Sequence, residues 1–515
     1  MRNKIVAALL AVVTLLSCGQ APAPFLAEHA QLDLLITNAT VYDGIGSEPF
    51  AADVVVDDGV IVYVGRHGFS PAELGQRVIR KIDAAGRVLA PGFIDLHAHG
   101  DPLQTPQFEN FLAMGVTTIT LGQDGDSPAV DDLSAWLDEV AARGIGPNLA
   151  MFVGHGTLRN QAGIGTQATP DAADLQAMLA ALERTLGYTF GLSTGLEYNP
   201  GLHAAAPELQ ALAQVVGRHG RLIMSHLRSE DDEQLEASIA ELLDQGQYAR
   251  VHISHLKSVY GKGAARAAEL LAILERARAA GIDITADVYP YSASYAGISL
   301  LFPVWAKTAE QFAVARTTRR EELRAYLRQR ILLRNGPEAT LLGTEPYTGK
   351  TLAEVSFELE LPFEDVLIDV IGPQGASAAY FVMNDALQSR LLASPLVGVC
   401  SDGSPSGWHP RGHGAFAKII QKYVVAEKVL TLGEAIVKMT SFPATLLGIR
   451  DRGAIRAGMR ADLLIFDPAR VRENASYPAP HQLAEGFDVV IVNGRVARED
   501  GRVSDALSGL VLTPD

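Results

Sequence analysis

Residues 91–101 read PGFIDLHAHGD, an apolar run that closes with two histidines one residue apart. Side chains alternate along a β-strand, so His97 and His99 project to the same side with their backbones about 6.5 Å apart. That spacing suits two ligands of one metal ion, or of two adjacent ions. A His-x-His pair alone is a weak signal, and its meaning depends on what the rest of the chain adds.

The same kind of apolar run recurs along the chain, separated by helical patterns such as those of residues 172–186 and 263–281. The strand candidates are 88–99, 116–124, 148–155, 188–198, 221–226, 249–257, 282–291 and 395–402. Eight strand–helix units over about 350 residues predict an α/β fold, a (β/α)8 TIM barrel, for residues 91–445.

Potential metal ligands and catalytic groups gather at the carboxyl ends of these strand candidates. They are His97, His99, Asp124, His155, His226, His255 and Asp402. In a (β/α)8 barrel the carboxyl ends of the strands form the catalytic face. The sequence therefore predicts an active site at that face.

The two ends of the chain have a different pattern. Residues 31–90 and 446–515 contain short β-like runs with turn signals such as Asp-Gly and Asn-Gly. We expect them to form one small β-sandwich domain beside the barrel. The segment of about 303–370 is longer than a simple crossover, which predicts a helical insertion.

Composition narrows the classes of partner. With 515 residues, 48% of them hydrophobic, the chain can bury a large core. The formal net charge is −16 and there is no basic run, which argues against a nucleic-acid partner. A small-molecule substrate is expected, and the sequence leaves the oligomeric state open.

The N-terminus has the features of an export signal. Residues 1–18 combine a basic start with a short apolar stretch and end in LLSC, which resembles a bacterial lipobox. Cys18 would then be lipidated, residues 19–30 would be a tether, and the protein would face the periplasm from the cell envelope, touching the membrane only through its lipid. A plain secretory peptide is the alternative. Only Cys400 would remain, which excludes an intrachain disulfide, and we interpret it as core filler.

The chemistry of the predicted site follows from the residue types. His226 and His255 each end a strand of their own, and imidazole is the commonest ligand of catalytic zinc, so with the first pair they predict one or two Zn²⁺ ions. Asp402 would take a proton from the attacking water and return it to the leaving group. Its alternative role is to cap the Asp-Gly-Ser-Pro turn.

Several longer motifs add a resemblance. GFIDLHAH, GHGTLR, GLSTGLEYNPG, SHLRSE, ADVYPYSA, SDGSP and HPRGHGAF occur in this order. With the segment 439–468, they make residues 31–515 similar to the amidohydrolase superfamily, and more narrowly to the N-acyl-D-amino-acid deacylase (D-aminoacylase) family. The resemblance implies hydrolysis of a linear amide by metal-activated water.

The resemblance also implies roles for individual residues. His226 and His255 match ligands of a tightly held zinc, His97 and His99 match a second site, and Asp402 matches the catalytic aspartate. Arg411, with Tyr289 or Tyr291, matches the group that holds the substrate's carboxylate, although Arg411 could also be a loop salt-bridge partner. His155 and Arg159 would polarise the carbonyl or line the pocket, or else be structural; Lys257 would support the site or lie at the surface.

One position departs from the family pattern. Asp124, in GQDG, stands where the family has a zinc-binding cysteine. A carboxylated lysine cannot replace it, because no lysine occurs between Lys81 and Lys257. The metal-bridging carboxylate is then Asp124 or Glu197, and strand parity favours Asp124. The departure leaves the substrate open: an exported dipeptidase, a cyclic amidase and a non-catalytic binding lipoprotein are the alternatives.

Overall fold

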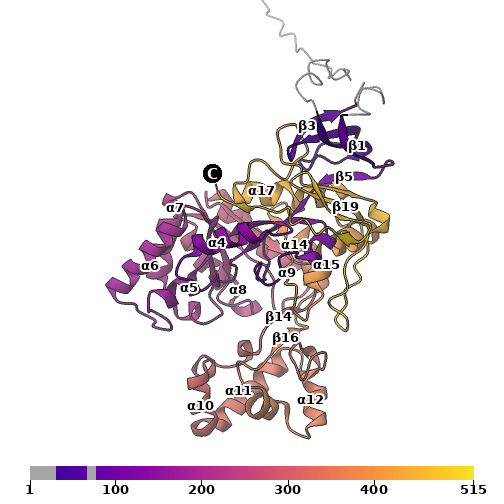
Figure 1. The fold of residues 1–515 in the computed structure, drawn as a ribbon. Coiled ribbons are helices and arrows are strands. Elements are labelled where there is room, and N and C mark those ends of the chain that lie inside the picture. The colour runs from indigo at the N-terminus through magenta and orange to yellow at the C-terminus, as the bar shows by residue number, and fades with distance from the viewer. Residues whose placement is uncertain (1–30, 67–76, 515) are drawn as a thin grey trace, which may run out of the picture.

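The computed structural model describes residues 31–66 and 77–514 (Figure 1). The expected signal peptide, the tether and Cys18 lie outside the described residues. No helix in the described part is both long and apolar enough to cross a bilayer.

A closed ring of parallel strands forms the centre of the molecule. Its strands are β6 (Phe93–Asp95), β7 (Val116–Leu121), β8 (Asn148–Met151) continued by β9 (Val153–Gly154), β10 (Gly191–Gly195), β11 (Leu222–His226), β12 (Arg250–Ile253), β13 (Ile284–Val288) and β17 (Val397–Val399). They pair in chain order, and a parallel bridge between Ala98 and Gly403 closes the ring. This confirms the predicted (β/α)8 barrel.

Helices surround the ring. They are α3 (Glu109–Ala113), α4 (Leu133–Arg143), α5 (His155–Gln161), α6 (Ala172–Thr185), α7 (Ala206–Arg218), α8 (Asp232–Gln245), α9 (Gly263–Ala279), α14 (Asp385–Leu392), α15 (Arg411–Lys418), α16 (Leu432–Met439) and α17 (Ser441–Leu447).

Helix α7 shows why these segments fold as they do. Its buried side chains include Leu209, Leu212, Ala213 and Val216, which recur at helical spacing and form one apolar face. The strands between the helices, such as β7 and β11, are buried along their whole length, as is usual for the parallel strands of a barrel.

The β domain combines both ends of the chain, as predicted. Its strands are β1 (Leu32–Val41), β2 (Phe50–Asp57), β3 (Val60–Gly65), β4 (Val78–Asp83), β5 (Val88–Pro91), β18 (Leu463–Phe466), β19 (Phe487–Val492), β20 (Arg495–Glu499) and β21 (Arg502–Val503). Antiparallel pairing of β5 with β18 joins the two parts, and their apolar side chains share one cluster. A last strand, β22 (Val511–Leu512), pairs with β8 of the barrel.

A helical body interrupts the chain between β13 and β17. It contains β14 (Ser294–Gly297), β15 (Thr340–Leu342), β16 (Ser377–Tyr380), α10 (Ala309–Thr318), α11 (Arg320–Leu333), α12 (Leu352–Glu358) and α13 (Phe363–Asp365), with a π-helical turn at Val366–Ile371. The insertion therefore extends beyond the expected residues 303–370 at both ends. It has an apolar core of its own.

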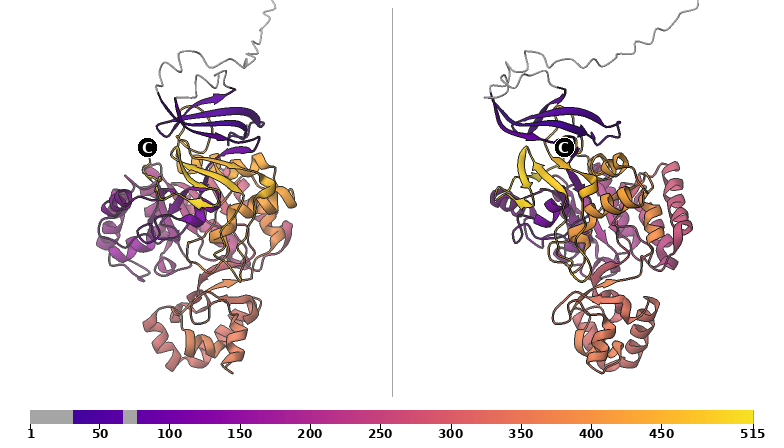
Figure 2. Two further views of the ribbon diagram at one scale, coloured as in Figure 1. Left: turned by 45° about the vertical axis from the view of Figure 1, so that its right-hand side comes forward. Right: turned by 90° about the vertical axis from the view of Figure 1, so that its right-hand side faces the viewer.

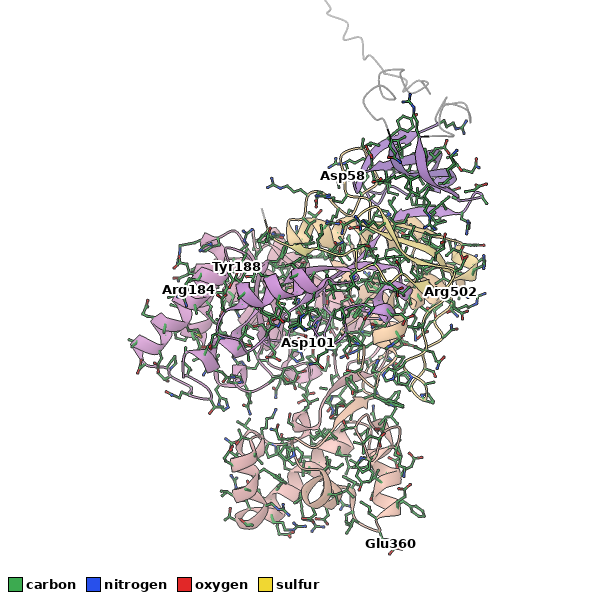
Figure 3. The ribbon with its side chains drawn as sticks, viewed as in Figure 1. Asp58, Asp101, Arg184, Tyr188, Glu360 and Arg502 are labelled. Atoms are coloured by element: carbon green, nitrogen blue, oxygen red, sulfur yellow. The ribbon has the colours of Figure 1, made fainter. Side chains whose placement is uncertain are left out.

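The three parts follow one another along the molecule. Both views of Figure 2 place the barrel between the β domain and the helical insertion. Figure 3 marks Glu360 at the far tip of the insertion and Asp101 within the barrel. Residues of the insertion, including Tyr295 and Leu300, line a cavity together with residues at the carboxyl ends of the barrel strands. The insertion therefore lies over part of the catalytic face.

Candidate active site

The predicted ligands converge at the carboxyl end of the barrel, with Asp124 at their centre. Asp124 Oδ1 lies 3.2 Å from His97 Nε2 and 3.1 Å from His255 Nε2. The same oxygen is 3.6 Å from His226 Nδ1, and Oδ2 is 3.5 Å from His99 Nε2. One carboxylate thus faces four imidazoles that come from three different strands.

Asp402 joins the cluster from the loop that follows β17. Its Oδ1 lies 3.2 Å from His99 Nε2 and 3.8 Å from His97 Nε2. Its Oδ2 accepts a hydrogen bond of 2.6 Å from Arg411 Nη1. The backbone N–H of Asp402 donates to the His97 carbonyl at 2.8 Å, which joins the end of β17 to the end of β6.

The donor set fits zinc. His97 is fully buried, its Nδ1 has no hydrogen-bond partner among the described residues, and its Nε2 lies 3.2 Å from Asp124 Oδ1 without the geometry of a hydrogen bond. His226 Nδ1 and His255 Nε2 point at each other 3.1 Å apart, as imidazoles do when they share a cation. Nitrogen and carboxylate oxygen are the ligands that catalytic zinc takes, and an imidazole buried without a partner is otherwise costly. The residues therefore suit one or two Zn²⁺ ions.

Two sets of side chains have ligand atoms close enough to share an ion. The first set is His97, Asp124, His255 and Asp402, and the second is His226, Glu230 and His255. Glu197, the alternative bridging residue, lies 3.1 Å from His226 Nε2 and belongs to neither set. Asp124 belongs to the first set and also lies 3.6 Å from His226 of the second, which favours it over Glu197 as the bridging carboxylate.

The backbone at the site is strained. Asp124, His255 and Asp402 have φ values of 55°, 39° and 51°, in the left-handed region that residues other than glycine seldom adopt. Each such residue costs on the order of 1–3 kcal/mol, and strain of this kind is typical of functional sites. Gly195 makes the arrangement possible, because a Cβ there would lie 1.9 Å from the Asp124 carbonyl oxygen.

The charges at the site stabilise one another. Burial lowers the pKa of His99 and of His226, but the surrounding carboxylates outweigh burial and raise each pKa to about 10. Burial likewise opposes ionisation of Asp402, but the guanidinium of Arg411 outweighs it and holds the pKa of that carboxyl well below its usual range. Both aspartates of the cluster are therefore anionic at neutral pH, as metal ligands must be.

A second layer of acidic residues fixes the ligand loops. Asp95 Oδ1 accepts from the backbone N–H of His97 at 3.1 Å. Asp287 Oδ1 accepts from the backbone N–H of His255 at 2.5 Å. Glu230 Oε1 lies 3.2 Å from His255 Nδ1 and 2.5 Å from Lys257 Nζ. The expectations from sequence omitted these three acids, although they lie in the motifs FIDLH, ADVYPY and SHLRSE.

A cavity of about 260 Å³ opens beside the cluster, and several predicted substrate-binding residues line it. Lys257, Tyr289 and Arg411 all face it. Arg411 lies with its guanidinium carbon 5.0 Å from the centre of the Tyr289 ring, and its Nη2 donates to the Tyr295 carbonyl at 3.2 Å. Lys257 is buried rather than at the surface, and its Nζ lies 2.8 Å from His255 Nδ1.

Tyr291 is placed differently from its neighbour Tyr289. Its hydroxyl donates to Glu473 Oε1 at 2.5 Å and to the Pro410 carbonyl at 3.3 Å, outside the cavity. Of the two tyrosines that the sequence left open, the structure brings only Tyr289 to the site.

Of the two roles left open for His155 and Arg159, the structure supports the structural one, and it does not support a catalytic role for His155 or a pocket-lining role for Arg159. His155 Nε2 lies 2.7 Å from Glu208 Oε1, and Arg159 Nη1 contacts both oxygens of Glu208 at 2.7 and 2.6 Å. Strand β9 ends at Gly154 and His155 begins α5, so its side chain turns toward α7 and away from the cluster. These residues form a buried structural link between two helices.

The ring of strands and the metal-binding cluster together define an amidohydrolase. Comparison with known protein families agrees with this class. Residues 349–498 match the family described as Amidohydrolase family. The N-acyl-D-aspartate deacylase of Alcaligenes xylosoxydans is 33% identical, over 94% of this chain and 96% of that one. The N-acyl-D-glutamate deacylase of the same organism is 31% identical, over 90% and 93%.

A solved structure extends the likeness to three dimensions. The N-acyl-D-glutamate deacylase from Bordetella bronchiseptica, complexed with zinc and a phosphonate mimic of the tetrahedral intermediate, matches with a TM-score of 0.79 and 30% identity. The match covers 94% of this chain and 100% of that one. The chain belongs to the N-acyl-D-amino-acid deacylase family of amidohydrolases.

Proposed function

We propose that the protein hydrolyses N-acyl-D-amino acids to a carboxylic acid and a D-amino acid. The observation that carries this proposal is the pair formed by Asp402 and Arg411. This pair connects the metal-binding cluster, which suits amide hydrolysis, with the buried guanidinium of Arg411, which suits a carboxylate of the substrate. A substrate with an amide one carbon away from a carboxylate would contact both. The relatives named for N-acyl-D-glutamate and N-acyl-D-aspartate support this substrate class.

Each residue of the cluster has a role in this reaction. Zn²⁺ held by the four histidines and Asp124 would supply a Lewis acid for the amide carbonyl and acidify the attacking water. Asp402 accepts a proton from that water and gives it to the nitrogen of the leaving amine. A carbon–oxygen bond forms, the carbon–nitrogen bond breaks, and one water is consumed.

Arg411 serves two purposes. Its bond to Asp402 keeps that carboxylate ionised, which a proton acceptor must be. Arg411, together with Tyr289 and Lys257, lines the cavity where the substrate's carboxylate would lie. The amine half of the substrate is thereby oriented so that its nitrogen approaches Asp402.

A substrate panel on zinc-reconstituted protein tests this function. The panel contains N-acetyl-D-amino acids, their L-enantiomers, dipeptides of mixed chirality and cyclic ureides, with release of amine as the readout. We expect turnover of the N-acetyl-D compounds and at least about 100-fold lower kcat/KM for the L-enantiomers, because inversion moves the amide away from Asp402. Turnover confined to dipeptides or cyclic ureides would contradict the proposal.

We also propose that the mature protein is anchored in the cell envelope by a lipid on Cys18 and faces the periplasm. The LLSC motif and the apolar stretch before it support this location. In a bacterial host, the full chain should incorporate labelled palmitate and fractionate with membranes. The Cys18→Ala variant should do neither. Label in both proteins, or in neither, would count against the anchor.

A further inference from the structure

A second and larger cavity meets the first at the metal-binding cluster. Its volume is about 800 Å³, against about 260 Å³ for the cavity beside Arg411. The two cavities share His99, Asp124 and Tyr198 as lining residues. The reacting carbonyl of a substrate must lie near that junction if the cluster is to act on it.

The smaller cavity has the character of a site for the amine half of the substrate. Its cations, Lys257, Arg334 and Arg411, suit the carboxylate that the proposed function requires. With the amino-acid half placed there and the carbonyl at the junction, the acyl half can extend only into the larger cavity.

The larger cavity offers apolar and polar surface in similar amounts. Its apolar lining residues come from the barrel strands, from α4 and from the loops that follow β7 and β10, and they are Ala98, Leu121, Pro128, Ala129, Trp136, Met151 and Pro200. Among the described residues that line it, none is a lysine or an arginine. Asp101 and Asp126 also line it, which disfavours an acyl group that carries a carboxylate.

Three polar side chains of this cavity are already engaged within the protein. Ser127 Oγ accepts from the Gly154 N–H at 3.0 Å, and Gln123 Nε2 donates to the Leu96 carbonyl at 3.3 Å. Asp101 accepts from the Leu103 N–H at 2.8 Å. These three side chains are therefore not free to bind a substrate, and beside them the cavity offers space and contact with its apolar residues.

We propose that this cavity is the acyl subsite and that it takes an extended, uncharged acyl chain in preference to acetyl. The proposal rests on the proposed function, because that function places the carboxylate beside Arg411. An acetyl group would leave most of the cavity filled by water, whereas cavities of this size ordinarily bury ligands of drug-like dimensions. The enzyme would select substrates strictly by their amine half, and it would select among acyl groups by the length of the apolar chain.

The test varies only the acyl group on one D-amino acid. We expect kcat/KM to rise from N-acetyl through N-butanoyl to N-octanoyl, by about 30-fold or more overall, since each buried methylene is worth about fourfold. A flat or falling series would overturn the subsite while leaving the deacylase function standing. A preference for L-aminoacyl groups over octanoyl would also overturn it. Absence of turnover on every N-acyl-D-amino acid would overturn the function and, with it, the subsite.

Two variants place the effect in this cavity. Trp136→Ala removes its largest apolar side chain, and Ala129→Trp fills it; each should lower the ratio of octanoyl to acetyl kcat/KM by about tenfold. Phe357→Ala is the matched control, because this aromatic residue is 85% exposed on the insertion, and it should leave the ratio unchanged. An unchanged ratio in both Trp136→Ala and Ala129→Trp would contradict the assignment.

Binding provides a readout that does not depend on turnover. Octanoate added to the zinc-loaded protein should quench the fluorescence of Trp136 and should bind at least about tenfold more tightly than acetate. The Trp136→Ala variant should lose this part of the fluorescence change. Equal affinity for the two carboxylates would overturn the subsite.

Discussion

Asp124 has the most demanding position in the site. It is held in a left-handed backbone conformation at the end of β7 and contacts imidazoles from both proposed zinc positions. Its oxygens are harder ligands than the thiolate that the family pattern has there. A carboxylate can bridge two ions through its two oxygens, so this residue favours a pair of metals.

Removing the Asp124 carboxylate should therefore change the metal content. We expect Asp124→Ala to bind less zinc per chain than the wild type after reconstitution and dialysis, measured by elemental analysis. Glu197→Ala is the matched control, because Glu197 contacts only His226 within the cluster, and it should retain more zinc than Asp124→Ala. Equal zinc in Asp124→Ala and the wild type would refute the bridging role.

Strand ends explain which residues could be placed from sequence alone. His97 and His99 lie just beyond β6, which ends at Asp95, and both contact Asp124. Tyr289 and Tyr291 lie beyond β13, which ends at Val288, and there the alternation of a strand no longer fixes the direction of a side chain. His155 fails for a similar reason, since it begins a helix. Motif position cannot reveal where a strand stops.

At the scale of elements, α5 and α7 are joined by charges buried between them. Arg159 and Glu208 are both almost fully buried, and each is the main partner of the other. Glu208→Ala should lower the free energy of unfolding by about 3–5 kcal/mol, because it leaves a buried guanidinium without its counter-charge. Chemical denaturation of the zinc-loaded protein measures this loss.

An exposed ion pair provides the comparison for that prediction. Arg143 and Glu139 form a pair on the surface of α4, and Glu139→Ala should cost less than about 1 kcal/mol. A loss in Glu208→Ala as small as that in Glu139→Ala would mean that the buried link does not hold the two helices together.

At the scale of the whole molecule, the barrel and the two-ended β domain were predictable because both rest on hydrophobic pattern. Eight apolar runs with polar ends predicted eight strands, and short runs with tight turns at both termini predicted one domain. The extent of the insertion was not predictable. Strands β14 and β16, which frame it, are short and pair with each other across more than 70 intervening residues, so no local pattern marks them.

The insertion also explains why the substrate cavity could not be read from the sequence. Its wall combines the ends of barrel strands with Tyr295 and Leu300 of the insertion, which pack there through contacts distant in the chain. Motifs locate the cluster that performs the chemistry. The packing of the insertion against the barrel determines what reaches that cluster.

The central claim is that Asp402 moves the proton in a zinc-dependent hydrolysis, and Asp402→Asn tests it most directly. The amide preserves the size of the side chain, so the variant should fold, and elemental analysis should find zinc as in the wild type. Its kcat on the best N-acyl-D-amino acid should fall by about 10²–10⁴-fold, the usual contribution of a general acid–base group. A zinc-loaded Asp402→Asn enzyme with a kcat near that of the wild type would contradict the account.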